Sequence, residues 1–511
     1  MKKQSLVKGT FILGFAGIFS KAIGIFFRIP LAILIGDEGL GYYQMAYPLY
    51  MLFIASASGV PLAMSKMISE KNVQGDQKGV IQVLKQALFL MGILGIGTSM
   101  FMIIFAKWLI QLFRWDNSAY YSLLALGVAP VFISLMSALR GFFQGLQNMT
   151  PTAVSQILEQ IGRIVIGIGL AIMFLPKGIE YAAGGATLGA AAGGILGGTY
   201  LLSKYRKIRK EFNVSNIKLE PRVMDNLLRI SIPISLGAAV GTIMNVIDSI
   251  IVPQGLLDVG FTSRQAAILY GQLTGKAAVL VNVPLTISVA LCASIVPIIS
   301  ETYTLNKKGM MNKNIISAMK ISAIIALPSM CGLYFLASPI LNLVFRGNVE
   351  GYLILKYSSI EIPFIILTQT TTVILQSTTS KKMPIFHLLI GCIVKIIMTN
   401  FFISIPEINV YGAVIGTISA YITVVILNMI LLKIKLGITP NLYQIFIKPA
   451  YASTIMTICV VFIYTKMYDN TINQSISCLV AIVIGIIMYI ILILVFKIVD
   501  YQKVKNKVIK K

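Results

Sequence analysis

Long apolar runs dominate this sequence and limit the folds open to it. Many runs reach roughly 20 residues, enough to cross a hydrocarbon core of about 30 Å as an α-helix. Of the 511 residues, 57% are hydrophobic and only 12% are charged, which is about half the charged share of a soluble domain. Strands of a membrane barrel would be shorter and would alternate in polarity. The sequence therefore predicts an all-α integral membrane protein.

We expect about fourteen transmembrane helices. The predicted spans cover residues 9–36, 42–66, 84–110, 118–143, 152–175, 180–203, 226–251, 267–299, 315–340, 352–379, 384–405, 409–434, 443–466 and 474–498. An even number of spans places both termini on the same side of the membrane. The first apolar stretch carries Lys21 and Arg28 and has no small-residue cleavage site, so we interpret it as an uncleaved span.

The net charge of +25 follows from membrane topology rather than from a nucleic-acid partner. With the N-terminus in the cytoplasm, 31 of the 43 Lys and Arg residues lie on the cytoplasmic side, 7 lie outside and 5 lie within spans. Lys and Arg on short loops set the orientation of membrane helices. We therefore expect a multi-pass protein of the cytoplasmic (inner) membrane with both termini in the cytoplasm. No basic groove interleaved with aromatic residues suggests nucleic-acid binding.

Sequence landmarks divide the chain into two repeats. Pro151 and Pro384, and the Gly-Ala-x-x-Gly motifs that begin at Gly185 and Gly412, recur in the same order at offsets of 233 and 227 residues. Such repeats are typical of secondary transporters. We expect a six-helix bundle at 1–224, a second at 225–436, and two additional helices with a basic cytoplasmic tail at 437–511.

The sequence does not suggest an enzyme. It contains no nucleophile elbow, no Walker loop and no carboxylate pair in a loop. The five cysteines lie inside apolar runs without C-x-x-C spacing, so we expect neither disulfides nor a metal site. No cofactor is indicated. The function classes that remain open are a secondary transporter and a channel.

Ionisable residues inside the spans are the candidate functional residues, because each is costly in the bilayer unless it faces protein or water. Lys21 and Arg28 lie seven residues apart and share one helix face. Glu159 and Arg163 have the i, i+4 spacing of an ion pair, which is either structural or part of a binding site. With Lys276 these residues are the candidate substrate-binding set. The candidate ion-coupling residues are Asp248, Glu361, His387 and Lys395. The alternative for Asp248, Lys395 and Lys276 is a side chain that extends to the membrane interface, and the alternative for His387 is a structural hydrogen bond.

Two further patterns concern packing and lipid. Gly185, Gly189, Gly193 and Gly197 form a small-residue stripe that favours the close approach of another helix. Basic residues between 78 and 89 and after 497 are expected to bind anionic membrane lipids.

Several motifs resemble the stage V sporulation protein B family, in the polysaccharide-exporter branch of the multidrug/oligosaccharidyl-lipid/polysaccharide superfamily. They are Ser5-Leu6-Val7-Lys8-Gly9-Thr10, Phe19-Ser20-Lys21-x-x-Gly24, Ser58-Gly59-Val60-Pro61-Leu62-Ala63-x-Ser65-Lys66, and Arg140-Gly141-x-x-Gln144-Gly145 before Pro151. The family is similar to MurJ-type lipid II flippases and multidrug exporters of the MATE type.

This resemblance implies fourteen helices in two bundles and outward movement of an undecaprenyl-diphosphate-linked precursor for the spore cortex. It also implies that Lys21 and Arg28 line the cavity and that the lipid tail lies in a groove beside the two added spans. Two departures stand against a full match. Tyr47-Pro48-Leu49-Tyr50-Met51 lacks the arginine that the lipid II flippases carry in span 2, and Lys276 matches the eighth-helix base only loosely.

Three alternative functions remain open. The first is an exporter of another polysaccharide-linked lipid in the same superfamily, which the two departures leave possible. A cation-coupled drug exporter of the same superfamily would favour an acidic, aromatic cavity, whereas the intramembrane charges here have a basic excess. A scaffold that associates with cell-wall synthesis proteins would carry out no transport. A lipid-linked oligosaccharide is the substrate partner expected for the flippase.

The predicted topology can be tested at Ser215, in the connection between residues 203 and 225. A single cysteine at this position of an otherwise cysteine-free variant should resist a membrane-impermeant thiol reagent in intact cells and react after lysis. Labelling from outside would contradict the cytoplasmic assignment.

Overall fold

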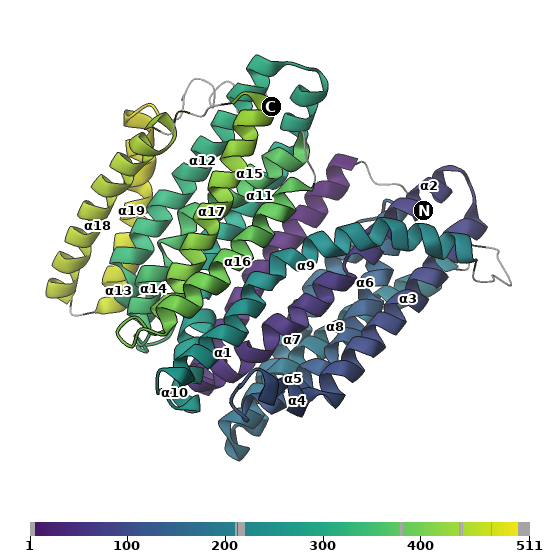
Figure 1. Cartoon of the computed structure of the whole chain (residues 1–511), viewed down its shortest axis with the longest axis horizontal. Helices are drawn as coiled ribbons and strands as arrows, with labels where there is room; N and C mark the ends of the chain where they lie inside the picture. The colour runs from purple at the N-terminus through teal and green to yellow at the C-terminus, as the bar shows by residue number, and fades with distance from the viewer. Residues whose placement is uncertain are drawn as a thin grey trace. The chain divides into compact units, whose positions relative to one another are not determined.

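The structure is a computed structural model, shown in Figure 1. It describes residues 6–209, 212, 220–378, 382–438, 441, 443–471 and 473–498. Within these ranges only the backbone is described at 6–11, 18, 21, 22, 25, 26, 444, 470 and 471. The Lys21 side chain and the basic tail after residue 498 therefore lie outside the described residues.

Helix is the regular secondary structure throughout the described residues, which confirms the all-α class. The chain divides into two compact units, Met1–Gly271 (unit 1) and Gln272–Lys511 (unit 2). The division falls inside the eighth predicted span, where an α-helix meets a π-helical turn. The expected domain boundaries at 224 and 436 concern the sequence repeats and stay a prediction.

The described residues contain 13 helical segments long and apolar enough to cross a membrane. From the third predicted span onward, their ends differ from the predicted ends by at most seven residues. The first segment, Phe27–Val73, has 47 residues and is far longer than one span needs. This segment accounts for the difference between 13 segments and the expected fourteen spans.

The first helix, α1 (Leu6–Ala57), reverses direction at Gly36. Gly36 has φ 65° and ψ −172°, a conformation that side chains with a Cβ rarely adopt. The Arg28 guanidinium lies 5.8 Å from the centre of the Tyr47 ring. In a straight helix these two residues would be separated by about 28 Å along the axis. The predicted first and second spans therefore lie on either side of Gly36.

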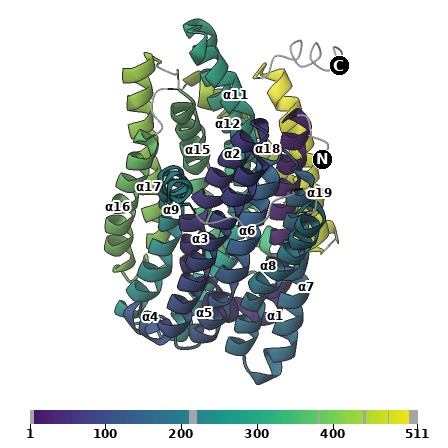
Figure 2. The same cartoon turned by 90° about the vertical axis from the view of Figure 1, so that its right-hand side faces the viewer.

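Unit 1 continues from α1 with helices that pack into one bundle. These are α2 (Gly59–Val73), α3 (Gln77–Ile104), α4 (Ala106–Leu112), α5 (Ala119–Gly127), α6 (Ala129–Gly145), α7 (Thr150–Phe174), η1 (Leu175–Lys177), α8 (Ile179–Arg209), α9 (Pro221–Asp258) and α10 (Ser263–Gly271). Helices α7 and α8 form a closely packed hairpin (Figures 1 and 2).

The glycine stripe of α8 lies against α7, as the sequence predicted. A Cβ on Gly189 would approach the Arg163 carbonyl oxygen to 2.6 Å and the Gly167 Cα to 2.9 Å. A Cβ on Gly185 would meet the Leu170 backbone at 2.9 Å. These distances leave no room for a side chain, so glycine allows the two backbones to touch.

Unit 2 repeats this hairpin with different sequence. Its elements are η2 (Gln272–Ala277), α11 (Ala278–Thr304), α12 (Lys308–Phe335), α13 (Ala337–Val344), α14 (Tyr352–Ser358), α15 (Glu361–Ser377), α16 (Met383–Ile403), α17 (Tyr411–Leu436), η3 (Tyr443–Ile447), α18 (Lys448–Thr471) and α19 (Gln474–Val495). Pro384 is the second residue of α16, as Pro151 is the second residue of α7. Gly412 and Gly416 of α17 contact the α16 backbone, so both repeats contain a glycine-packed hairpin.

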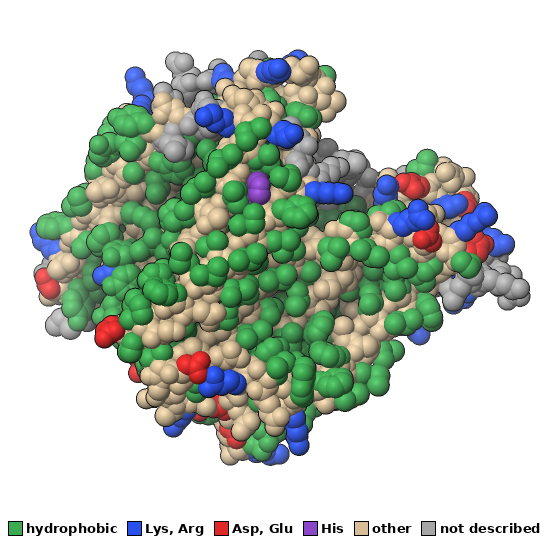
Figure 3. All heavy atoms as spheres, in the orientation of Figure 1, with side chains coloured by type: hydrophobic (Ala, Val, Ile, Leu, Met, Phe, Trp, Pro, Cys, Tyr) green, Lys and Arg blue, Asp and Glu red, His purple; other side chains and the backbone are tan. Residues whose placement is uncertain are grey.

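The surface agrees with a membrane location. Hydrophobic side chains cover the middle of the helices on the face seen in Figure 3, whereas charged side chains gather at helix ends. Many large apolar side chains are exposed, including Val165 at 65% and Ile172 at 56% on α7. Lipid tails would cover such side chains. The protein is therefore a multi-pass membrane protein.

The glycine stripe predicts the effect of a large side chain on stability. Gly189→Leu should destabilise the protein by about 1–3 kcal/mol or more, because the new side chain forces α7 and α8 apart. The measurement is the melting temperature of the detergent-purified protein. The matched control is Gly169→Leu on α7, where a Cβ meets nothing within 4 Å. Equal melting temperatures for the two variants would contradict the packing role.

Candidate functional site

Helix α7 presents a polar face inside unit 1. Gln156, Glu159, Gln160 and Arg163 recur at spacings of three and four residues, which places them on one side of the helix. A Cβ on Gly193 of α8 would collide with the Glu159 carbonyl oxygen. The glycine stripe thus holds the backbone of α7 that carries this polar face.

Glu159 is paired with two arginines. Its Oε2 lies 2.9 Å from Nη2 of Arg140 on α6, and its Oε1 accepts a hydrogen bond from Arg163 Nη2 at 3.5 Å. The three side chains are only 11–15% exposed. Removing charges from water is costly unless partners compensate them. One carboxylate here compensates two guanidinium groups, so the cluster keeps a positive excess.

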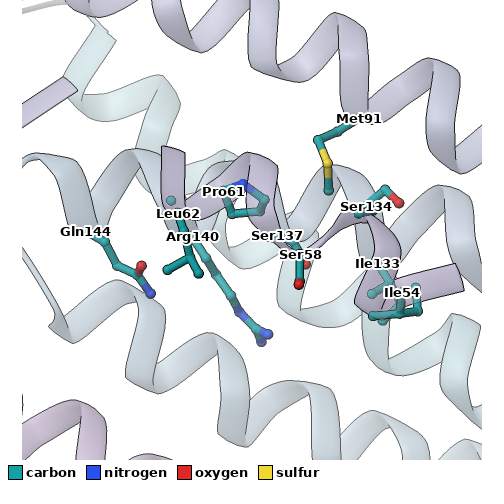
Figure 4. Close-up of a pocket in the computed structure, with 12 residues that line it drawn as sticks. Ile54, Ser58, Pro61, Leu62, Met91, Ile133, Ser134, Ser137, Arg140 and Gln144 are labelled. Atoms are coloured by element: carbon teal, nitrogen blue, oxygen red, sulfur yellow. The ribbon is translucent and has the colours of Figure 1, made fainter. Parts of the chain in front are cut away.

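Arg140 connects this ion-pair cluster to a cavity of about 280 Å³. Its Nε donates to Ser155 Oγ at 2.8 Å, which fixes the guanidinium beside α7. The polar groups that line the cavity are Ser58, Ser134, Ser137, Arg140 and Gln144. Figure 4 shows the Arg140 side chain extending from α6 among these groups. The cavity thus joins a cation to hydroxyl and amide groups.

The two spans of α1 add a third arginine and a tyrosine ladder. Arg28 packs over the Tyr47 ring at 5.8 Å, a cation–π geometry. The Tyr47 hydroxyl accepts a hydrogen bond from Arg163 Nη1 at 3.4 Å. Tyr47 also lies 5.5 Å from Tyr43 and 5.8 Å from Tyr50, measured between ring centres. Tyr47 therefore links Arg28 to the α7 cluster.

The face of α1 that carries Lys21 and Arg28 turns toward α7. Gly24 belongs to the same face, and a Cβ there would lie 3.6 Å from Gln160 Oε1. The backbone thus places position 21 on the side of α1 that faces the polar side of α7. The role of the Lys21 side chain stays a prediction.

Several buried polar atoms of this cluster have no protein partner within the described part of the chain. They are Gln156 Oε1, Gln160 Oε1 and Arg163 Nε. Buried polar atoms in native proteins nearly always have a hydrogen-bond partner, from protein, water or a ligand. These atoms are therefore suited to meet a polar ligand between α1, α6 and α7.

The other predicted binding residue, Lys276, belongs to unit 2. It lies in the π-helical turn η2, a geometry often found at functional sites. Its Nζ donates to the Glu350 carbonyl oxygen at 3.3 Å and lies 5.7 Å from the Phe345 ring centre. Its ammonium is thus engaged by the segment that connects α13 and α14, and its proposed contact with substrate stays a prediction.

The four candidate ion-coupling residues lie on three helices. Asp248 is half-buried on α9 of unit 1. In unit 2, Glu361 begins α15, while His387 and Lys395 are buried on α16. Each has polar or charged interactions in the structure, and none of these interactions tests ion coupling. Among the described residues, no group of three or more His, Cys, Asp or Glu side chains is arranged to hold a metal ion.

Sequence reasoning missed the part of Arg140 in this cluster. Its position near a helix end placed it among the cytoplasmic charges of the topology analysis. The approach of α6 to α7 brings it to Glu159, and spacing within one helix cannot reveal such a contact. The available signal was the motif Arg140-Gly141-x-x-Gln144-Gly145, in which Arg140 had been noted without a role.

Comparisons with known proteins identify relatives over most of the chain. Residues 6–303 match the family of polysaccharide biosynthesis proteins. Stage V sporulation protein B of Bacillus subtilis (strain 168) is 31% identical over 437 residues, which cover 84% of this chain and 83% of that protein. The lipid II flippase MurJ of the same organism is 26% identical over 471 residues, which cover 87% of this chain and 85% of that protein.

Solved structures show the same fold. An inward closed conformation of the lipid II flippase MurJ superposes with a TM-score of 0.72 at 19% identity, covering 95% of this chain and 98% of that one. An inward-facing MATE family transporter of the MOP superfamily gives a TM-score of 0.69 at 14% identity, covering 82% and 94%. These relatives are flippases and transporters, as the sequence predicted, and not enzymes. The chain belongs to the family of polysaccharide biosynthesis proteins.

Proposed function

We propose that this protein is a flippase that moves an undecaprenyl-diphosphate-linked peptidoglycan precursor, similar to lipid II, outward across the cytoplasmic membrane by alternating access. The observation that carries the proposal is the cluster of Arg28, Arg140 and Arg163 around Glu159 inside unit 1. Relatives named as a lipid II flippase and a stage V sporulation protein support the same substrate class and a role in sporulation; we propose that the precursor serves the spore cortex.

The charges of the cluster suit a diphosphate. Guanidinium groups present paired donors that match phosphate oxygens. Two unit charges about 4 Å apart attract by about 4 kcal/mol at an effective dielectric constant of 20. Three arginines and one carboxylate leave an excess of two positive charges, which offsets much of the cost of bringing a diphosphate into the membrane. Lys21 is proposed to add a further cation.

The neutral polar groups suit the sugar part of the precursor. Gln156 and Gln160 offer buried amide oxygens that have no partner among the described residues, and the cavity beside Arg140 adds serine hydroxyls and Gln144. Sugar hydroxyls and acetamido groups can donate to and accept from such groups. A drug exporter that binds organic cations would gain nothing from three arginines, so the charge of the cluster favours the flippase over this rival.

The lipid tail requires an apolar surface. Unit 2 contains an apolar groove of about 440 Å³ between α11, α12, α13, α18 and α19. Val283, Pro328, Ile340, Val460 and Ile486 are among its lining residues. We propose that the polyprenyl chain lies in this groove, beside the two helices that extend the six-helix repeats.

Glu159 is proposed to serve as an internal counter-ion. Its carboxylate pairs with Arg140 and Arg163, the same guanidinium groups that would bind phosphate oxygens. An incoming diphosphate must share or displace the carboxylate. This competition lowers affinity and thereby permits release on the outer side. An inside-negative potential would favour the return of a cationic empty cavity, by about 2.3 kcal/mol per charge per 100 mV.

Transport by charge variants tests the proposed site. In proteoliposomes, Lys21→Ala and Arg28→Ala should abolish translocation of a lipid-linked precursor, whereas Lys21→Arg should retain most of it, because charge matters more than shape. Expression and melting temperature should stay near those of the unchanged protein.

The matched control for these variants is Arg264→Ala, since the Arg264 side chain is 70% exposed and pairs with Glu38. This variant should transport normally, since exposed ion pairs contribute little. A well-folded Lys21→Ala protein with normal translocation would contradict the site. A protein without translocation in any form, despite correct folding, would support the scaffold instead.

The counter-ion role of Glu159 predicts an increase in affinity on neutralisation. Glu159→Gln should bind a soluble prenyl diphosphate at least about tenfold more tightly, equivalent to about 1.4 kcal/mol, because Arg140 and Arg163 lose their competitor. Turnover should fall as release slows. Calorimetric titration of the purified protein measures the affinity. The control is Glu38→Gln, which neutralises the partner of the exposed Arg264, and unchanged or weaker binding by Glu159→Gln would refute the role.

A further inference from the structure

A buried polar network in unit 2 joins three helices. Nδ1 of His387 on α16 lies 2.7 Å from Oδ1 of Asn428 on α17. The Asn428 amide nitrogen donates to Thr371 Oγ1 at 3.0 Å and to Thr372 Oγ1 at 3.2 Å, both on α15. His387 is 6% exposed and Asn428 is fully buried. Polar groups inside membrane spans are costly and often functional.

The network selects one tautomer of the neutral imidazole. The Asn428 nitrogen donates to the two threonines, so its oxygen is the atom that faces the ring. An amide oxygen only accepts hydrogen bonds, and Nδ1 must therefore carry the hydrogen. The remaining ring nitrogen, Nε2, then has the lone pair that can take up a proton.

The helices around His387 offer a protonated imidazole little compensation. Helices α16 and α17 contain no Asp or Glu. The carboxylate of α15 is Glu361 at its first residue, about 15 Å along the helix from Thr371. The other ionisable groups are Lys382, Cys392 and Lys395 on or beside α16, and Tyr411, Tyr421, Lys433 and Lys435 on α17. None of them is an anion near neutral pH, so among these three helices a proton on the buried ring has only the neutral amide of Asn428 as a partner.

His387 lies near the start of α16. His387 lies four residues after the first residue of α16, Met383, and so about 6 Å from the helix start. The exposed residue Lys382 precedes that start. The chain has a single histidine, and its purple atoms are visible between hydrophobic side chains in Figure 3, although the residue is buried.

We propose that His387 is a proton-binding site of unit 2. One proton from the aqueous phase binds to Nε2 and converts the neutral ring into a cation, and the same proton returns to water when the site empties. Because the buried cation lacks a carboxylate on these helices, the proton binds when α16 moves enough to hydrate the ring edge and leaves when α16 repacks on α15 and α17. Proton occupancy is thereby linked to the packing of these three helices. Its effect on transport rests on the proposed flippase function, whereas proton binding itself does not.

The single histidine makes direct detection simple. Full-length protein labelled with ¹⁵N-histidine in nanodiscs should give one imidazole spin system, with hydrogen on Nδ1 at high pH and on both nitrogens at low pH. The spectra are recorded from about pH 5 to about pH 8, the range in which histidine side chains serve as physiological switches. A ring that stays in one protonation state across this range while the protein remains folded overturns the proposal.

Variants of the partner give a second test. Asn428→Asp places a carboxylate beside the ring and should move the transition upward by about one pH unit or more. The matched control is Asn400→Asp, which adds the same charge at an exposed position of α16 about 20 Å along the helix and should leave the transition unchanged. Equal midpoints in both variants would overturn the assignment of the site to the His387–Asn428 pair.

Transport supplies the readout for coupling. Precursor translocation by the unchanged protein should depend on pH with the midpoint seen by NMR, and His387→Gln should remove that dependence while keeping a comparable melting temperature. A pH profile that is the same in His387→Gln refutes the coupling. A titrating ring in a folded protein that translocates no precursor would leave the proton site standing and refute the proposed function.

Discussion

The contact between the α7 and α8 backbones is the constraint on which the candidate site depends. Glycines at every fourth position of α8 remove the side chains that would separate the helices. The carbonyl groups of Glu159 and Arg163 lie at this contact, so the residues that carry the charges are held by the close packing of the hairpin. Two charged side chains therefore leave a backbone with little freedom to shift. The partner residues on α1 and α6 therefore meet Glu159 and Arg163 at defined positions, because the α7–α8 hairpin is closely packed.

Periodicity within a helix predicted much of this arrangement, and contact between helices explains what it missed. Apolar run lengths located the spans, and the fourfold glycine spacing identified the packed face of α8. The i, i+4 spacing predicted the Glu159–Arg163 pair. Arg140 was missed because its partner lies on another helix, and no spacing along α6 reports that approach. The division of the chain at Gly271, inside a span, likewise depends on which helices pack together.

The two repeats share a scaffold but not its chemistry. Each contains a helix with proline as its second residue, followed by a helix packed through glycine. At the offset of 233 residues that relates Pro151 to Pro384, Glu159 corresponds to Cys392 and Arg163 to Ile396. The second hairpin thus lacks the Glu–Arg pair and carries His387 and Lys395 on its first helix instead. We propose that this difference in side chains assigns anion binding to unit 1 and proton binding to unit 2, on the same backbone geometry.

The reversal at Gly36 gives the first two spans an unusual mechanical relation. A loop between spans normally allows the two spans to move independently, because its residues can rearrange while each span stays in place. Here a single non-helical residue makes the turn, so no flexible loop separates the two spans. Because Arg28 also packs on the Tyr47 ring, the two spans are joined both at the turn and along their length. We therefore expect a tilt of the span that carries Arg28 to move the span that carries Tyr47 with it, so that the cation and the ring keep their contact.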